Sequence, residues 1–250
     1  MSRVVVAHEE AKIREPALDV ARELGLEAVG VADGASARAI LRWAAPDILL
    51  VDVGLPGALG YELVDEIRQL ALPTRVILIA SVYSKTAYKR KPSSLYGAFD
   101  YIEQHHIVDD LAGKIWAALG QSADGRGRDA GENTMRRERG AIADAGVRRL
   151  RYDAAMLTPD ENAQRMARLL VADVLLYAGE SAEAWIEDGA HTEKIPEQLT
   201  EDLREARRLF NAEVPETVRA RADYVGEALV RAVAGRSGVD VTQTLTPFEE

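Results

Sequence analysis

Short runs of consecutive apolar residues recur through the first 120 residues, and they constrain the fold more than any other feature. Four such runs lie at residues 3–7, 28–31, 48–53 and 76–80, and a fifth strand fits residues 99–102. The apolar residues do not alternate with polar ones, which is typical of strands that are buried on both faces of a parallel sheet. The runs therefore predict a five-stranded sheet covered by helices on both sides.

Helical periodicity fills the intervals between these runs. Apolar residues are spaced for one face of a helix over residues 11–24, 35–44 and 60–71, and another helix is expected over 109–119. Strands that alternate with helices in this way favour right-handed crossovers in a doubly wound α/β sheet. We predict that residues 1–120 form one α/β domain of the flavodoxin-like class.

The second half of the chain has a different pattern. Residues 121–157 are charged and rich in Gly, so they are expected to be a linker that could include a short helix over 140–156. Thr158, Pro159 and Glu161 form a strong helix start, because Thr158 and Glu161 fit a capping box. Apolar stripes over 166–181, 199–210 and 218–235 predict three helices. Residues 158–236 should therefore form an all-α helical bundle domain that serves as an output or interaction module, and residues 237–250 should be a flexible tail.

Composition narrows the classes of protein that remain. The chain has no cysteine, which excludes disulfides and thiolate metal sites. Its N-terminus lacks the apolar region of a signal peptide, and no stretch approaches the roughly 20 apolar residues of a membrane span. A cytoplasmic protein without a membrane partner is expected. The formal net charge of −10 argues against a nucleic-acid partner, so the basic runs are interpreted as solvated surface.

Polar residues follow four of the predicted strands, at the sheet edge where α/β proteins place their chemistry. These residues are His8, Glu9 and Glu10 after the first strand, Asp52 at the end of the third, Ser81 after the fourth, and Glu103 to His106 after the fifth. Because the carboxyl ends of parallel strands meet at one edge, these side chains are expected to gather there.

Two segments of the first half resemble a known family. Residues 46–57, PDILLVDVGLPG, and the following Gly60 to Leu63 resemble the acceptor-aspartate segment of response-regulator receiver domains. Residues 97–102, GAFDYI, are similar to the entry into the fifth strand of that family. The resemblance covers roughly the first half of the chain and implies the flavodoxin-like receiver fold in a bacterial two-component system.

The resemblance implies a phosphorelay reaction, in which a histidine kinase transfers a phosphoryl group to an aspartate with Mg²⁺ as cofactor. Asp52 matches the phospho-acceptor and Ser81 the switch hydroxyl. The acidic-pair positions fall on His8 and Glu9, and the lysine position falls on Gln104. A histidine is a poor Mg²⁺ ligand and Gln104 carries no charge, so Glu9 and Asp52 are left as ligands of a weakened Mg²⁺ site.

The histidines allow two interpretations of this edge. In one, His8, Glu9, Asp52 and His105, with Glu103, form a transition-metal pocket of a metal-dependent hydrolase. In the other, His8 hydrogen-bonds Asp52 and replaces the metal as an internal counter-ion, while His105 and His106 are surface or capping residues. The second interpretation is favoured, because the spacing matches no known histidine metal motif.

The sequence favours an atypical response regulator, or pseudo-receiver, that acts by protein–protein interaction and is not an enzyme. Its expected partner is a histidine kinase or another signalling protein, and a homodimer is compatible with the family. A DNA-binding transcriptional response regulator is the alternative. The basic, tyrosine-containing segment 83–96 fits either a docking surface or a solvated loop with two tyrosines anchored in the core, of which the loop is favoured.

Overall fold

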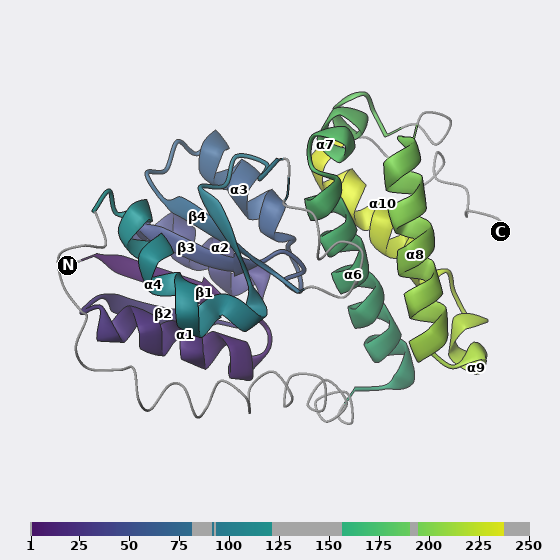
Figure 1. Ribbon diagram of the computed structural model, residues 1–250, viewed down its shortest axis with the longest axis horizontal. Coiled ribbons are helices and arrows are strands. Elements are labelled where there is room, and N and C mark those ends of the chain that lie inside the picture. Colours follow the sequence, from purple (N-terminus) through teal and green to yellow (C-terminus); the bar gives the residue numbers. More distant parts are fainter. Residues whose placement is uncertain (1, 82–91, 93, 122–156, 191–194, 238–250) are drawn as a thin grey trace.

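The computed structural model describes residues 2–81, 92, 94–121, 157–190 and 195–237 (Figure 1). Strands and helices alternate through the first part of the chain, as the apolar runs predict. The elements are β1 (Arg3–Ala7), α1 (Ala11–Glu23), β2 (Glu27–Val31), α2 (Gly34–Ala44), β3 (Ile48–Asp52), α3 (Gly60–Gln69), β4 (Arg75–Ala80), β5 (Asp100–Glu103), a short 3-10 helix (Gln104–His106) and α4 (Ile107–Ala118).

The five strands form one sheet in the order β2-β1-β3-β4-β5, and every neighbouring pair is parallel. This is the strand order of the flavodoxin-like doubly wound fold, so the predicted fold class is confirmed. The order reverses direction at β1 and β3, which places the ends of these two strands at the switch point where such folds bind ligands.

Helices cover both faces of the sheet. On one face α1 and α4 enclose a buried cluster that includes Val4, Val6, Leu18, Ile48, Leu111 and Ile115. On the other face α2 and α3 cover a second cluster, which includes Val5, Leu41, Leu49, Leu63 and Leu78. This second cluster continues into the helices of the chain's second part, through Tyr61, Tyr96, Leu170, Leu175 and Trp185. The two parts of the chain therefore share one hydrophobic core.

The second part of the chain, residues 157–190 and 195–237, has helices as its regular elements, and we call it the helical region. Its elements are α6 (Pro159–Ala178), α7 (Glu180–Glu187), α8 (Glu197–Glu213), α9 (Glu216–Arg219) and α10 (Tyr224–Ser237). The predicted start of α6 is confirmed, since Thr158 accepts from Glu161 N and the Glu161 side chain accepts from Thr158 N. Helix α6 packs against α8 and α10 on one side and faces the α/β part on the other (Figure 1).

Two predicted helix boundaries are wrong. The stripe expected to reach Ser181 is interrupted because Gly179 adopts φ 51°, which ends α6 at Ala178 and starts α7 in a new direction. The helix expected over 218–235 is split into α9 and α10. Asp223 lies between them, and its side chain accepts a hydrogen bond from Gly226 N, as an N-cap does at a helix start.

Several expectations fall on residues that the structure does not describe. Residues 122–156 of the expected linker, residues 238–250 of the expected tail and most of segment 83–96 lie outside the described residues. Tyr96 is an exception, because its side chain is buried in the core as the loop interpretation predicts. Within the described ranges, no helix combines the length and the apolar character that crossing a membrane would need.

Candidate functional site

Asp52 is the last residue of β3, and its side chain is fully buried. One carboxylate oxygen accepts a hydrogen bond from Gly54 N at 3.2 Å, while the other has no hydrogen-bond partner. Burial raises the pKa of Asp52 to about 7, because a carboxylate that is removed from water loses its hydration. The nearby carboxylate of Glu9 raises this pKa further, and Gly54 N opposes the change.

His8 follows β1 and lies beside Asp52, with its Nε2 3.8 Å from Asp52 Oδ2. That distance is too long for the hydrogen bond that the counter-ion interpretation expects. His8 Nδ1 accepts a hydrogen bond from Glu10 N at 3.0 Å, which holds the ring in place beside Asp52. Burial lowers the pKa of His8 to about 4, which makes the imidazole neutral at pH 7. His8 therefore contributes no positive charge to Asp52, and this part of the interpretation is wrong.

Gln104, at the lysine position, joins His8 to the switch hydroxyl. Its side-chain amide lies 3.0 Å from His8 Nε2 and donates a hydrogen bond to Ser81 Oγ. The structure thus brings His8, Asp52, Ser81 and Gln104 together at one edge of the sheet, where the strand pattern places them.

Two arginines of the helical region bring positive charge to this site. Arg165 on α6 binds Glu9 through its Nε atom and Glu10 through a terminal nitrogen. Arg168, one turn further along α6, donates to Glu9 Oε2 at 3.0 Å and to the Gly54 carbonyl oxygen at 2.8 Å. Both oxygens of Glu9 are therefore held by guanidinium groups.

Neither arginine stands out in the sequence as a site residue. Arg165 binds carboxylates that lie 156 and 155 positions earlier in the chain, and no local pattern specifies such distant partners. The available signal is weak: two arginines three positions apart lie within a helix whose described residues are otherwise mostly buried. Glu10 is among the residues expected at the strand ends, and it is the second carboxylate that pairs with Arg165.

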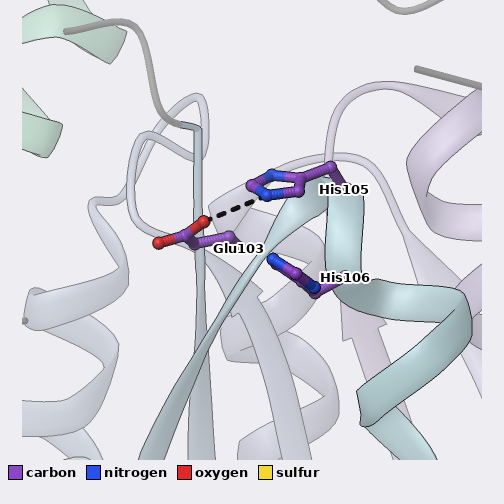
Figure 2. A group of neighbouring side chains, drawn as sticks. All are labelled: Glu103, His105 and His106. Atoms are coloured by element: carbon purple, nitrogen blue, oxygen red, sulfur yellow. Dashed lines mark ion pairs between the residues drawn. The ribbon is translucent and has the colours of Figure 1, made fainter. Parts of the chain in front are cut away.

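His105 does not join the pocket around Asp52. Its Nε2 lies 3.3 Å from Glu103 Oε2, and Figure 2 shows both His105 and His106 near the Glu103 carboxylate. Among the described residues, the one group of three potential metal ligands that lie close together is Glu103, His105 and His106. The alternative interpretation, in which His8, Asp52 and His105 converge on one metal, is wrong, because Gln104 is the residue of this segment that points toward His8.

The two shifted pKa values predict opposite effects of pH on stability. Asp52 binds its proton more tightly in the folded chain, at about 7 against 3.8, so its contribution falls as the pH rises from about 4 to 7. His8 binds its proton less tightly when folded, at about 4 against 6.5, so its contribution rises from about pH 4 to 6.5. The two contributions oppose each other over this range.

We therefore expect Asp52→Asn to become more stable relative to the unmodified chain as the pH rises from 4 to 7, because it lacks the cost of ionising a buried carboxyl. The matched variant His8→Gln should show the reverse trend between pH 4 and 6.5. Urea unfolding at a series of pH values measures both differences. A difference that stays constant across this range would show that Asp52 ionises as easily in the folded chain as in the unfolded one.

Comparisons with known proteins agree with this architecture. Residues 4–115 match the family model of the response regulator receiver domain. The chain is 30% identical over 124 residues to the sensory transduction protein RegX3 of Mycolicibacterium smegmatis, an alignment that covers 50% of this chain and 53% of that protein. It is 30% identical over 118 residues to the transcriptional regulatory protein PdtaR of Mycobacterium tuberculosis, which covers 47% and 56%. The chain spans about half the length of these curated relatives.

Two solved structures are also similar. The receiver domain of the Francisella response regulator 1452 is 21% identical, with a TM-score of 0.41, and the match covers 48% of this chain and 98% of that one. The response regulator DrrB of Thermotoga maritima, an OmpR/PhoB homologue, is 19% identical, with a TM-score of 0.40, and the match covers 48% and 53%.

Residues 4–115 are thus a receiver domain of the response-regulator family, whose members act in two-component signalling. The family match ends at residue 115, before the helical region begins.

Receiver domains bind Mg²⁺ at the phosphorylation site. The residues around Asp52 do not fit this ion while α6 packs against them. Mg²⁺ requires several oxygen ligands in a near-octahedral arrangement. Here both oxygens of Glu9 are paired with arginines, and Glu10 is paired with Arg165 and Lys12. The remaining acidic-pair position holds a buried imidazole. The cationic groups needed to balance these carboxylates are already present in the chain.

Proposed function

We propose that this protein is an atypical response regulator in which the helical region docks on the receiver site and replaces Mg²⁺ with arginine side chains. The observation that supports this proposal is the pairing of Arg165 and Arg168 with Glu9 and Glu10. In this proposal the receiver transmits its signal by holding or releasing the helical region. The chain acts through protein–protein contact and has no catalytic role of its own.

The charges around the site support this exchange of an ion for side chains. Glu9, Glu10 and Asp52 lie close enough to influence one another, since both glutamates raise the pKa of Asp52. Three carboxyl groups so close together require compensating positive charge. A guanidinium is always charged and binds two carboxylate oxygens at once, so Arg165 and Arg168 provide that charge without a metal.

The packing of α6 supports the proposal that a phosphodonor cannot reach Asp52 while the helical region is docked. A phosphodonor must approach an oxygen of Asp52 in line with its leaving group. Yet the Asp52 side chain is fully buried, and α6 lies directly against the loop after β3. A Cβ atom added to Gly54 would lie 2.7 Å from Leu169 Cδ2, which shows how closely the helix approaches. Docking and phosphorylation of Asp52 are therefore mutually exclusive in this proposal.

Release of the helical region would free two surfaces at once, the receiver site and the face of α6 that covers it. We propose that a histidine kinase or another signalling protein recognises one of these surfaces. Ser81 and Gln104 would then form the link through which changes at Asp52 reach the rest of the receiver. A homodimer formed through the released face is compatible with the same arrangement.

Intact-mass measurement after incubation with Mg²⁺ and acetyl phosphate tests the proposal. We expect the unmodified chain to gain no phosphoryl group, because α6 blocks Asp52. The double variant Arg165→Ala/Arg168→Ala should gain at most one group, and adding Asp52→Asn to it should abolish that gain. Rapid, Asp52-dependent modification of the unmodified chain, at the same rate as the double variant, would contradict the proposed docking function.

A further inference from the structure

A cluster of metal-binding side chains lies at the end of β5, outside the Asp52 site. Glu103 is the last residue of β5, and His105 and His106 belong to the 3-10 helix that precedes α4. One potential ligand atom from each of the three residues lies within 4.8 Å of the others. Figure 2 shows both imidazole rings close to the Glu103 carboxylate, so the three side chains converge from the end of the strand and the short helix that follows it.

The spacing of the ligand atoms suits a small transition-metal ion. In a tetrahedral zinc site with metal–ligand bonds of about 2.1 Å, neighbouring ligand atoms lie roughly 3.4 Å apart. Glu103 Oε2 and His105 Nε2 are 3.3 Å apart. The rings of His105 and His106 have centroids 4.1 Å apart, so the second imidazole is also close to this position. Since one ligand atom from each residue lies within 4.8 Å of the others, the three side chains are grouped closely enough to surround one ion.

Residues next to the cluster hold its side chains in the way that hydrogen-bonding neighbours hold the ligands of a metal. Ligating histidines usually direct their other ring nitrogen at a carboxylate, which fixes the ring orientation. His106 Nδ1 lies 3.4 Å from Asp110 Oδ2, which leaves the Nε2 of this ring for a metal. The second oxygen of Glu103 accepts a hydrogen bond from Tyr177 of α6 at 3.4 Å, which leaves Oε2 facing His105.

We propose that Glu103, His105 and His106 bind a divalent transition-metal ion of the Zn²⁺ type. Two nitrogen ligands and one oxygen ligand favour such an ion over Mg²⁺ or Ca²⁺, which prefer oxygen alone. The side chains of His105 and His106 are 39% and 46% exposed, so the fourth position of the ion is open to water or to a ligand from a partner. Because Tyr177 belongs to α6, the ion would bind where the helical region meets the receiver.

Isothermal titration of the metal-free full chain with ZnCl₂ tests the site. We expect one Zn²⁺ per chain, with binding abolished by His105→Ala and by His106→Ala. Asp110→Asn should weaken binding about 10- to 100-fold, the range typical of lost outer partners of metal ligands. Since both histidines are partly exposed, these variants should keep the unfolding midpoint of the unmodified chain in the absence of zinc.

The matched control is His191→Ala, which removes a histidine that lies outside the described residues. This variant should bind Zn²⁺ with unchanged affinity and stoichiometry. The proposal is overturned if the unmodified chain binds no Zn²⁺, or if His105→Ala and His106→Ala bind it as tightly as the unmodified chain does. It is also overturned if His191→Ala loses the binding, because the metal would then be held elsewhere.

Discussion

Arg165→Ala should lower the free energy of unfolding by about 3 to 5 kcal/mol, the cost of breaking a buried ion pair from one side. Its side chain is 10% exposed, and those of Glu10 and Glu9 are 7% and 19% exposed. The substitution removes the cation and leaves two poorly hydrated carboxylates close to Asp52. Urea unfolding, followed by circular dichroism at neutral pH, measures the loss.

An exposed ion pair of the same helical region provides the control. Arg204 pairs with Glu201, and their side chains are 66% and 56% exposed. Arg204→Ala should therefore change stability by less than about 1 kcal/mol. A double-mutant cycle that combines Arg165→Ala with Glu10→Gln should show that the two losses are not additive, because both remove the same contact. Additive losses would mean that Arg165 stabilises the chain through Glu9 or through packing, and not through its pair with Glu10.

The strands and the site edge could be predicted because both depend on short-range patterns. Consecutive Val, Ile and Leu mark the buried strands, and parallel pairing then brings their carboxyl ends to one edge. That topology alone places Asp52, His8 and Ser81 together, although their sequence positions are far apart. The start of α6 was equally accessible, since Thr158 and Glu161 form a local capping box.

The packing of α6 over the Asp52 site could not be predicted in the same way. The contact between Arg165 and Glu9 joins residues 156 positions apart, on elements separated by the undescribed residues 122–156. Periodicity identifies the apolar face of α6 but does not specify which surface covers it. His8 illustrates a second limit: its type suggests a counter-ion for Asp52, whereas its burial makes it neutral. Burial is a property of the assembled fold.

Docking of α6 also depends on two buried tyrosines of the receiver. Their truncation is therefore expected to cause a second large loss of stability. Tyr61 donates a hydrogen bond to the Ala172 carbonyl oxygen, and Tyr96 donates one to that of Leu175. Their rings contact each other, with centroids 4.6 Å apart. Both rings belong to the core cluster that spans the receiver and the helical region. The contact between the two parts is therefore both apolar and hydrogen-bonded.

Tyr61→Ala should destabilise the chain by about 3 to 5 kcal/mol, as large aromatic truncations in cores do. Tyr61→Phe and Tyr96→Phe keep the rings and remove one hydroxyl each, so each should cost about 1 kcal/mol. The measurement is urea unfolding, with hydrogen exchange of the α6 amides as a local probe. Because the contact joins the two parts, faster exchange in α6 should accompany each loss of stability.

Tyr101→Phe is the matched control, since Tyr101 lies on β5 and its side chain is only partly buried against the core. It should change stability by no more than about 0.5 kcal/mol and leave exchange in α6 unchanged. If Tyr61→Ala lowered stability without faster exchange in α6, its ring would support only the receiver. The arginine pairs and the Tyr96 hydrogen bond would then hold α6 over Asp52 without a contribution from Tyr61.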